Sequence, residues 1–146
     1  MASLIPKWVK KETVEQWIAT KEEMWLMLLK DTYAPSALHQ YVADVITHEI
    51  TDSNGVYVTG GVPVPSLEAL ANGNDYYLDG PDVSIGPGAN LNYRYGALYT
   101  TKNGVSNADY RIRALIDFDP VTFLNQIVTN GTSVIRWNSL GIILVS

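Results

Sequence analysis

Apolar and polar side chains alternate in two runs that flank a turn-rich segment between Leu91 and Phe118. Successive side chains of an extended chain point to opposite faces. One face of the first run carries Tyr93, Tyr95, Ala97 and Tyr99, and one face of the second carries Ile112, Ala114, Ile116 and Phe118. The connection contains Asn103-Gly104, a strong hairpin signal. We therefore expect a long antiparallel hairpin with one apolar face, which more sheet must cover because isolated hairpins are marginal in water.

Other short segments of strand type recur at fairly even spacing. Met24 to Leu29 is a continuous apolar run of strand length, which suits a strand buried on both faces or in the centre of a sheet, although periodicity alone does not separate it from a buried helical turn. Asp52-Ser53-Asn54-Gly55 is a turn signal, and the glycines and prolines of residues 60–65 limit any strand there to an edge or an irregular segment. Further strands are predicted at 75–78, 82–85, 133–137 and 142–145, with a strand or short turn at 121–128, a loop at 69–74 and a turn at 86–88.

Two segments near the N-terminus have helical spacing. Within residues 6–21, Trp17 and Ile18 follow Val14 by three and four positions, so they share a face of a short amphipathic helix. This helix would either dock as an arm on a neighbouring subunit or close one end of its own barrel or sandwich. Ser36 is placed to cap a second short helix over residues 37–45.

These patterns predict an all-β protein, mainly an antiparallel sandwich or barrel, with one or two short helices near the N-terminus. A length of 146 residues fits one domain of ordinary size. We expect an N-terminal arm or short helix over residues 1–22 and a β-sandwich or barrel domain over residues 23–146.

Composition narrows the class of partner. Charged residues make up 17% of the chain, against about 25% in typical globular domains, while there are nine Tyr and four Trp. Either a partner covers part of the surface, or the aromatic residues belong to a tyrosine-rich sheet. The net charge of −5 argues against a nonspecific nucleic-acid surface. Without cysteine there are no disulfides, and without an apolar run near ~20 residues we expect no membrane insertion and a soluble protein made in a cytoplasm.

The sequence holds few groups arranged for catalysis. His39 and His48 do not form a recognised metal-binding motif, so surface or hydrogen-bonded histidines are the better interpretation. Asp117 and Asp119 would share one side of an extended chain, where solvated strand-end charges are favoured over acid–base chemistry. We expect no enzymatic activity, no cofactor and no metal site.

The order of short motifs resembles that of a group of small virion proteins of tailed bacteriophages. The segments are MWLMLLKDTYAP, ALHQYVADVITHEI, NGVYVTGG, DVSI, YRYGALYTTK, RALIDFD and TSVIRWNSLGIILV. The matching residues are Tyr33, Pro35, His39, Tyr41, Glu49, Thr51, Tyr57, Gly60, Gly61, Arg94, Tyr95, Tyr99, Ile116, Asp117, Phe118, Trp137, Gly141, Ile142 and Leu144. The resemblance covers residues 23–146, and the Trp- and Lys-rich residues before Lys21 lie outside it.

This resemblance implies a β-rich, non-catalytic component of a phage particle, most simply a decoration or cement protein. Its partner would be the major capsid protein. The protein would be made in the bacterial host cytoplasm and would lie on the outer surface of the virion capsid. A homo-oligomer, with a trimer at a threefold position, would suit this role. A structural protein of the tail or head-to-tail joint is the alternative.

Exposed-looking aromatic residues are the candidate contacts. Trp8 and Trp17 mark the N-terminal segment, and Tyr76 and Tyr77 lie in the Gly/Pro-rich stretch of residues 60–88, which we expect to be an irregular binding loop. A more distant alternative is a carbohydrate-binding module in which Tyr76, Tyr77, Tyr93 and Tyr95 form a stacking platform for sugar rings.

Overall fold

The computed structural model describes residues 2–4, 23–64, 68–72, 75–101, 104–119, 122, 124–136 and 144–145. Strands dominate this part of the chain, and every pair of strands is antiparallel. The elements are β1 Ala2–Leu4, β2 Met24–Leu29, η1 Val42–Asp44, η2 Ile46–His48, β3 Val62–Val64, β4 Glu68–Asn72, β5 Asp75–Asp79, β6 Val83–Tyr93, β7 Tyr95–Thr100, β8 Arg111–Asp117, β9 Gln126–Ile135 and β10 Leu144–Val145. The prediction of an all-β protein with antiparallel pairing is confirmed.

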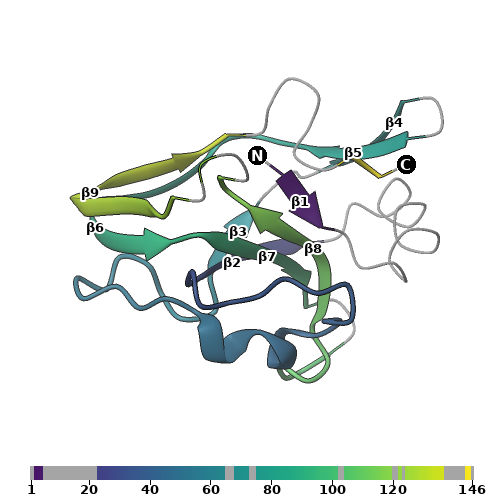
Figure 1. The fold of residues 1–146 in the computed structure, drawn as a ribbon, viewed down its shortest axis with the longest axis horizontal. Coiled ribbons are helices and arrows are strands. Elements are labelled where there is room, and N and C mark those ends of the chain that lie inside the picture. Colours follow the sequence, from purple (N-terminus) through teal and green to yellow (C-terminus); the bar gives the residue numbers. More distant parts are fainter. Residues whose placement is uncertain are drawn as a thin grey trace.

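The strands form three sheets. The largest has the order β1-β8-β7-β2-β3, the second the order β10-β5-β4, and the third is the two-stranded ribbon β6-β9. Figure 1 shows this ribbon extending to one side of the five-stranded sheet, with the β4-β5 pair at the opposite end. The predicted hairpin is present, because β7 pairs with β8 across the turn-rich segment.

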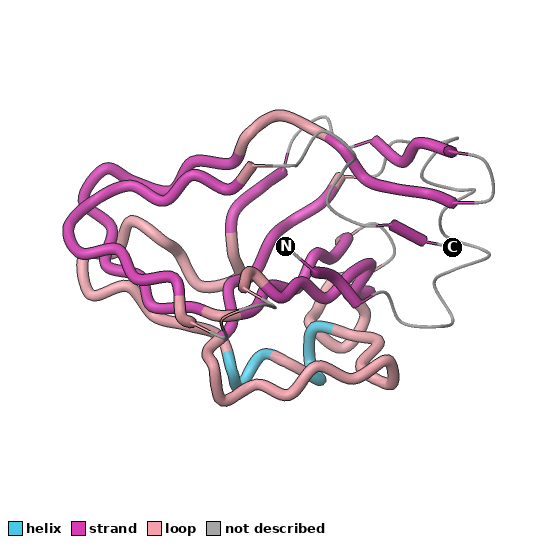
Figure 2. Tube along the Cα trace, turned by 45° about the horizontal axis from the view of Figure 1, so that its top comes forward, coloured by secondary structure: helices cyan, strands magenta, loops and turns pink. Residues whose placement is uncertain are grey.

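Both faces of the five-stranded sheet are buried. One face, which includes Leu26 and Leu98, packs against side chains of β6 and β9. The other face, which includes Leu29 and Ile112, is covered by the chain between β2 and β3, whose short helices lie below the sheet in Figure 2. The prediction of a hairpin with a single apolar face was therefore wrong, because separate segments cover each side.

The continuous apolar run of β2 lies inside this sheet, as predicted, with β7 on one side and β3 on the other. β3 pairs only with the first half of β2, from Met24 to Leu26. Beyond it, Ile50 donates a backbone hydrogen bond of 3.1 Å to the Leu28 carbonyl, and Leu29 forms an isolated bridge with Glu49. The edge position of the short, proline-containing β3 is confirmed, since proline cannot donate to a further strand.

A sharp bend at Arg94 separates β6 from β7. The Arg94 amide donates to the Leu29 carbonyl at 3.0 Å, and its guanidinium pairs with both carboxylate oxygens of Asp117 at 3.0 Å. Tyr93 therefore packs with one core cluster and Tyr95 against the other. The prediction that these two tyrosines share a strand face was wrong, because the chain changes sheet between them.

The predicted helix over residues 37–45 is replaced by η1 and η2, two single turns of 3-10 helix. Tertiary hydrogen bonds engage the backbone here: Val42 donates to Tyr110 at 2.9 Å, and Ile112 donates to Gln40 at 2.8 Å. These pairings with the segment before β8 compete with the bonds that an α-helix would need. The helix predicted within residues 6–21 lies outside the described residues.

The prediction of an irregular loop at 60–88 was wrong, because this stretch contains β3, β4, β5 and the start of β6. The predicted loop at 69–74 is mostly β4, which pairs with β5. The predicted turn at 86–88 lies inside β6, where the register with β9 shifts. Gly86 and Gly88 have positive φ there, so these residues form a bulge in a long strand instead of ending it. The segments predicted at 121–128 and 133–137 contribute to one strand, β9.

Candidate binding surfaces

The loop between η2 and β3 is anchored by the Asp52 carboxylate. Oδ1 accepts hydrogen bonds from the amides of Asn54 at 2.9 Å and Asn90 at 3.0 Å, and Oδ2 accepts from Val56 at 3.0 Å and Tyr57 at 2.9 Å. These bonds, that from Tyr57 above all, hold the pKa of Asp52 below its ordinary value. The predicted turn at 52–55 is confirmed, and the bond from Asn90 fastens it to β6.

A buried polar network lies at the other side of the same loop. The Tyr57 hydroxyl donates to the Glu49 carboxylate at 2.7 Å and accepts from the Leu28 amide at 2.9 Å. Glu49 also accepts from the Gly60 amide at 2.8 Å. Burial raises the pKa of Tyr57, and the nearby Glu49 carboxylate raises it further. Tyr57 thus completes the edge of β2 at the place where β3 has ended.

The loop is seated closely on the sheet. The Tyr99 hydroxyl donates to the Gly60 carbonyl, and burial raises the pKa of Tyr99 to about 12. Gly61 has φ +104°, and a Cβ there would overlap the backbone carbonyl of Leu26. Only glycine suits such a backbone and such a close approach.

An apolar groove of about 630 Å³ runs between this loop, β3 and the end of β7. None of the described residues that line it is charged, and they include Trp25, Val56, Val58, Val62, Pro63 and Tyr110. Val58 is 65% exposed, and the ring of Tyr110 stacks on that of Tyr99 with centroids 6.0 Å apart. Aromatic and aliphatic side chains without charges are typical of the centre of a protein–protein interface.

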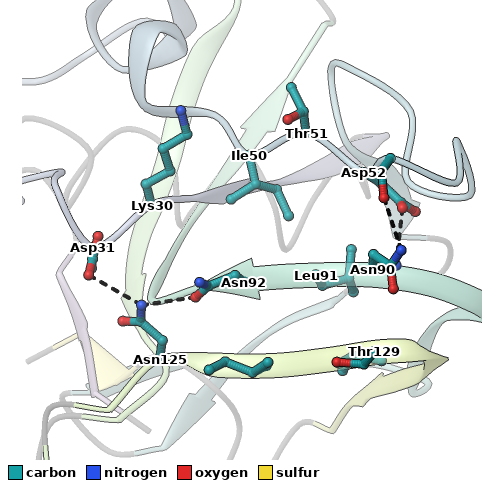
Figure 3. A pocket seen from close by; sticks show the side chains of 13 residues that line it. Lys30, Asp31, Ile50, Thr51, Asp52, Asn90, Leu91, Asn92, Asn125 and Thr129 are labelled. Atoms are coloured by element: carbon teal, nitrogen blue, oxygen red, sulfur yellow. Dashed lines mark hydrogen bonds between the residues drawn. The ribbon is translucent and has the colours of Figure 1, made fainter.

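A second cavity, here called the polar pocket, has a volume of about 720 Å³ and lies between residues 50–53 and the β6-β9 ribbon. Figure 3 shows two polar groups of side chains at its opposite ends, Asp31 with Asn92 and Asn125, and Asp52 with Asn90. Ile50 and Leu91 lie between them. The pocket therefore combines polar ends with an apolar floor.

One amide joins the elements at the first end of the polar pocket. Asn125 Nδ2 donates to Asp31 Oδ2 at 3.2 Å and to Asn92 Oδ1 at 2.9 Å. At the other end, Asn90 Nδ2 donates to Ser53 Oγ at 2.9 Å. These bonds hold the planar amide groups in set orientations, which is what recognition of a small polar ligand requires.

Both histidines lie beside Tyr33, on the face of the sheet that the chain between β2 and β3 covers. Nδ1 of His39 shares a hydrogen bond of 2.6 Å with the Tyr33 hydroxyl, and the His48 ring centroid is 5.4 Å from that of Tyr33. Burial raises the pKa of Tyr33 above its ordinary value. The interpretation of His39 as a hydrogen-bonded histidine is confirmed.

Asp117 and Asp119 do not act as a matched pair of solvated carboxylates. Asp117 is taken by the bidentate ion pair with Arg94, and its Oδ1 also accepts the Asp119 amide at 3.0 Å. The Asp119 carboxylate accepts from the Thr122 amide at 3.0 Å and the Leu124 amide at 3.2 Å. Both carboxylates therefore hold the chain after β8, and both stay partly exposed at the strand end.

The predicted contact residues are distributed unevenly over the structure. Trp8 and Trp17 lie outside the described residues. Tyr76 and Tyr77 lie on β5, the central strand of its sheet. Tyr93 is buried and bonds through its hydroxyl to Ser133 at 2.7 Å. Because Tyr93 is in the core and Tyr95 is across the bend, the predicted sugar-stacking platform of four tyrosines is not formed.

Sequence reasoning singled out the turn at 52–55 and the stretch from residue 60, which both contribute lining residues, but missed the others. The polar pocket draws Asp31, Asn92 and Asn125 from three separate segments, and the groove draws Trp25 and Val58 from two more. Single polar and apolar residues from separate segments have no characteristic spacing, so no signal in the chain marked these positions.

Comparisons with protein-family models, with characterised proteins and with solved structures found no match. Among the described residues, no three or more His, Asp or Glu side chains are grouped to hold a metal ion. No helix in the described ranges has the length and apolar character needed to span a bilayer.

Proposed function

We propose that this chain is a structural protein of a tailed-bacteriophage particle, and specifically a decoration protein on the outer surface of the capsid. The proposal rests on the order of motifs that resembles small virion proteins. One observation carries it: residues from separate motifs of that resemblance meet in two networks. Glu49, Tyr57, Gly60 and Tyr99 form the first, and Arg94 with Asp117 forms the second.

We also propose that residues 23–146 form one sandwich-like domain. Support comes from the core cluster shared by the five-stranded sheet and the β6-β9 ribbon, in which Leu26, Leu98 and Ile116 pack with Leu91 and Ile135. A scaffold of this kind can present loops without moving its core, as binding proteins commonly do.

The proposed contact with the major capsid protein is the apolar groove. Burial of exposed apolar surface contributes about 25 cal/mol per Å², and a protein that binds only the assembled shell stabilises it by mass action. The apolar side chains of Trp25, Val58 and Tyr110 in its lining suit such an interface. A homo-oligomer, with three copies around a threefold position, is consistent with this role.

The test combines a cryo-electron-microscopy map of the particle with two matched variants. Val58→Asp places a charge in the groove, whereas Val105→Asp places the same charge at a position that is 92% exposed and does not line the groove. We expect the first variant to lose binding to undecorated capsids and the second to keep it.

Density for the chain on the outer shell would support the proposal. Density in the tail or at the head-to-tail joint would replace it with the alternative role. Equal capsid binding by both variants would show that the groove is not the contact.

A further inference from the structure

We propose that the polar pocket binds a neutral saccharide through hydrogen bonds to adjacent hydroxyl groups. This inference is independent of the proposed capsid contact, because the pocket and the apolar groove share no lining residue. Its volume of about 720 Å³ falls within the range of about 300–1,000 Å³ that is usual for small-molecule sites.

The Asp31 end of the polar pocket holds hydrogen-bonding atoms that a ligand can use. Asn125 uses its amide nitrogen internally, towards Asp31 Oδ2 and Asn92 Oδ1. Within the described part of the chain, no hydrogen bond uses Asn125 Oδ1, Asn92 Nδ2 or Asp31 Oδ1. Two acceptors and one amide donor are thus held side by side, with their positions set by the internal bonds. A sugar hydroxyl both donates and accepts, so neighbouring hydroxyls complement such a mixed set.

The middle of the pocket is apolar, and hydroxyl groups lie at its rim. Ile50 and Leu91 lie between the two polar ends in Figure 3, and Val128 adds to the apolar lining. A pyranose ring has hydroxyls at its edge and C–H groups on its faces, and this division matches polar ends around an apolar floor. The hydroxyl groups of Thr51 and Thr129 add further donors and acceptors at the rim.

The charges around the polar pocket favour a neutral ligand. The described lining contains one cation, Lys30, and two carboxylates, Asp31 and Asp52. A phosphate or other anion would meet more negative than positive charge, and such sites normally gather several cationic or backbone donors. A neutral ligand with many hydroxyls avoids this repulsion and still uses the amides.

The experiment is an NMR titration of the full chain with methyl glycosides of glucose, galactose and N-acetylglucosamine, and with inorganic phosphate as an anionic probe. We expect saturable shifts of the Asn92 and Asn125 side-chain amides with at least one glycoside, at a Kd of about 1–10 mM, which is usual for a single small ligand with few contacts. Asn125→Ala should weaken binding by about tenfold or more, as expected when a set of hydrogen-bonding groups is lost.

Two further variants keep the test sharp. Asn92→Asp retains the oxygen that accepts from Asn125 and removes the amide donor, so it should weaken binding even if Asn125→Ala does not fold. Asn107→Ala removes an exposed asparagine outside the pocket and should leave the Kd unchanged. Absence of saturable shifts with all three glycosides, a response to phosphate alone, or full binding by Asn92→Asp would each overturn the proposal.

Discussion

Replacement of Tyr57 by phenylalanine tests whether the buried network holds the loop and the edge of β2. The change removes one oxygen and leaves the aromatic ring in the core. That oxygen donates to the Glu49 carboxylate at 2.7 Å and accepts from the Leu28 amide at 2.9 Å. Leu28 and Tyr57 are both buried, so water cannot easily replace either bond.

The expected cost follows from these two bonds. A hydrogen bond to a charged group contributes about 1.5–3 kcal/mol, and a buried donor left without a partner costs about 1–3 kcal/mol. Glu49 keeps its bond from the Gly60 amide, which limits the loss on that side. We therefore expect Tyr57→Phe to lower the free energy of unfolding by about 2–5 kcal/mol.

The assay is urea unfolding followed by tryptophan fluorescence, with the midpoint and the slope fitted separately. Tyr110→Phe is the matched control, because in the described part of the chain its hydroxyl makes no hydrogen bond while its ring stacks on Tyr99. The control should stay within about 0.5 kcal/mol of the parent chain. A Tyr57→Phe variant that is equally stable would refute the idea that this network carries stability.

Three further changes give distinct outcomes. Gly61→Ala should destabilise the chain by more than about 1 kcal/mol, because an alanine at φ +104° is strained and its Cβ meets the Leu26 backbone; an unchanged thermal midpoint would contradict this. Because the folded pKa of Asp52 is lowered, its contribution to stability is present above the ordinary carboxyl pKa of about 3.9 and is lost as the pH falls through the folded value. Asp52→Asn should therefore flatten the acid limb of a stability–pH curve, and an identical curve would count against the four-amide anchor. Replacement of Trp8 and Trp17 by alanine leaves β1 and its pairing with β8 in place and should weaken particle binding; unchanged binding would exclude these two residues as contacts.

The two cavities differ in their position and in the chemistry of their lining residues. The groove lies by the edge strand β3, and its described lining has no charged residue, whereas the pocket lies by the β6-β9 ribbon and is rich in amides. Both depend on the loop after η2, which Asp52 ties to β6 and Glu49 ties to β2 through Tyr57. A change at Asp52 or Glu49 is therefore expected to disturb this loop and, with it, both surfaces.

Local sequence determined much of the strand content. The unbroken apolar run of β2 required burial on both faces, since its residues have no polar side to turn to water. The β7-β8 hairpin followed from two alternating runs around a turn, and Pro63 limited β3 to an edge. The Asp52 turn was equally readable, because an aspartate can bond to amides of its own next few residues.

Only the tertiary structure decided where these elements meet. The bend at Arg94 depends on Asp117, which lies on β8, so alternation alone could not separate Tyr93 from Tyr95. The helix predicted at 37–45 gave way to backbone bonds from Val42 to Tyr110 and from Ile112 to Gln40, which link distant segments. The same reason hid both surfaces: their side chains come from separate strands and loops, and periodicity reports only which face a residue takes within its own element.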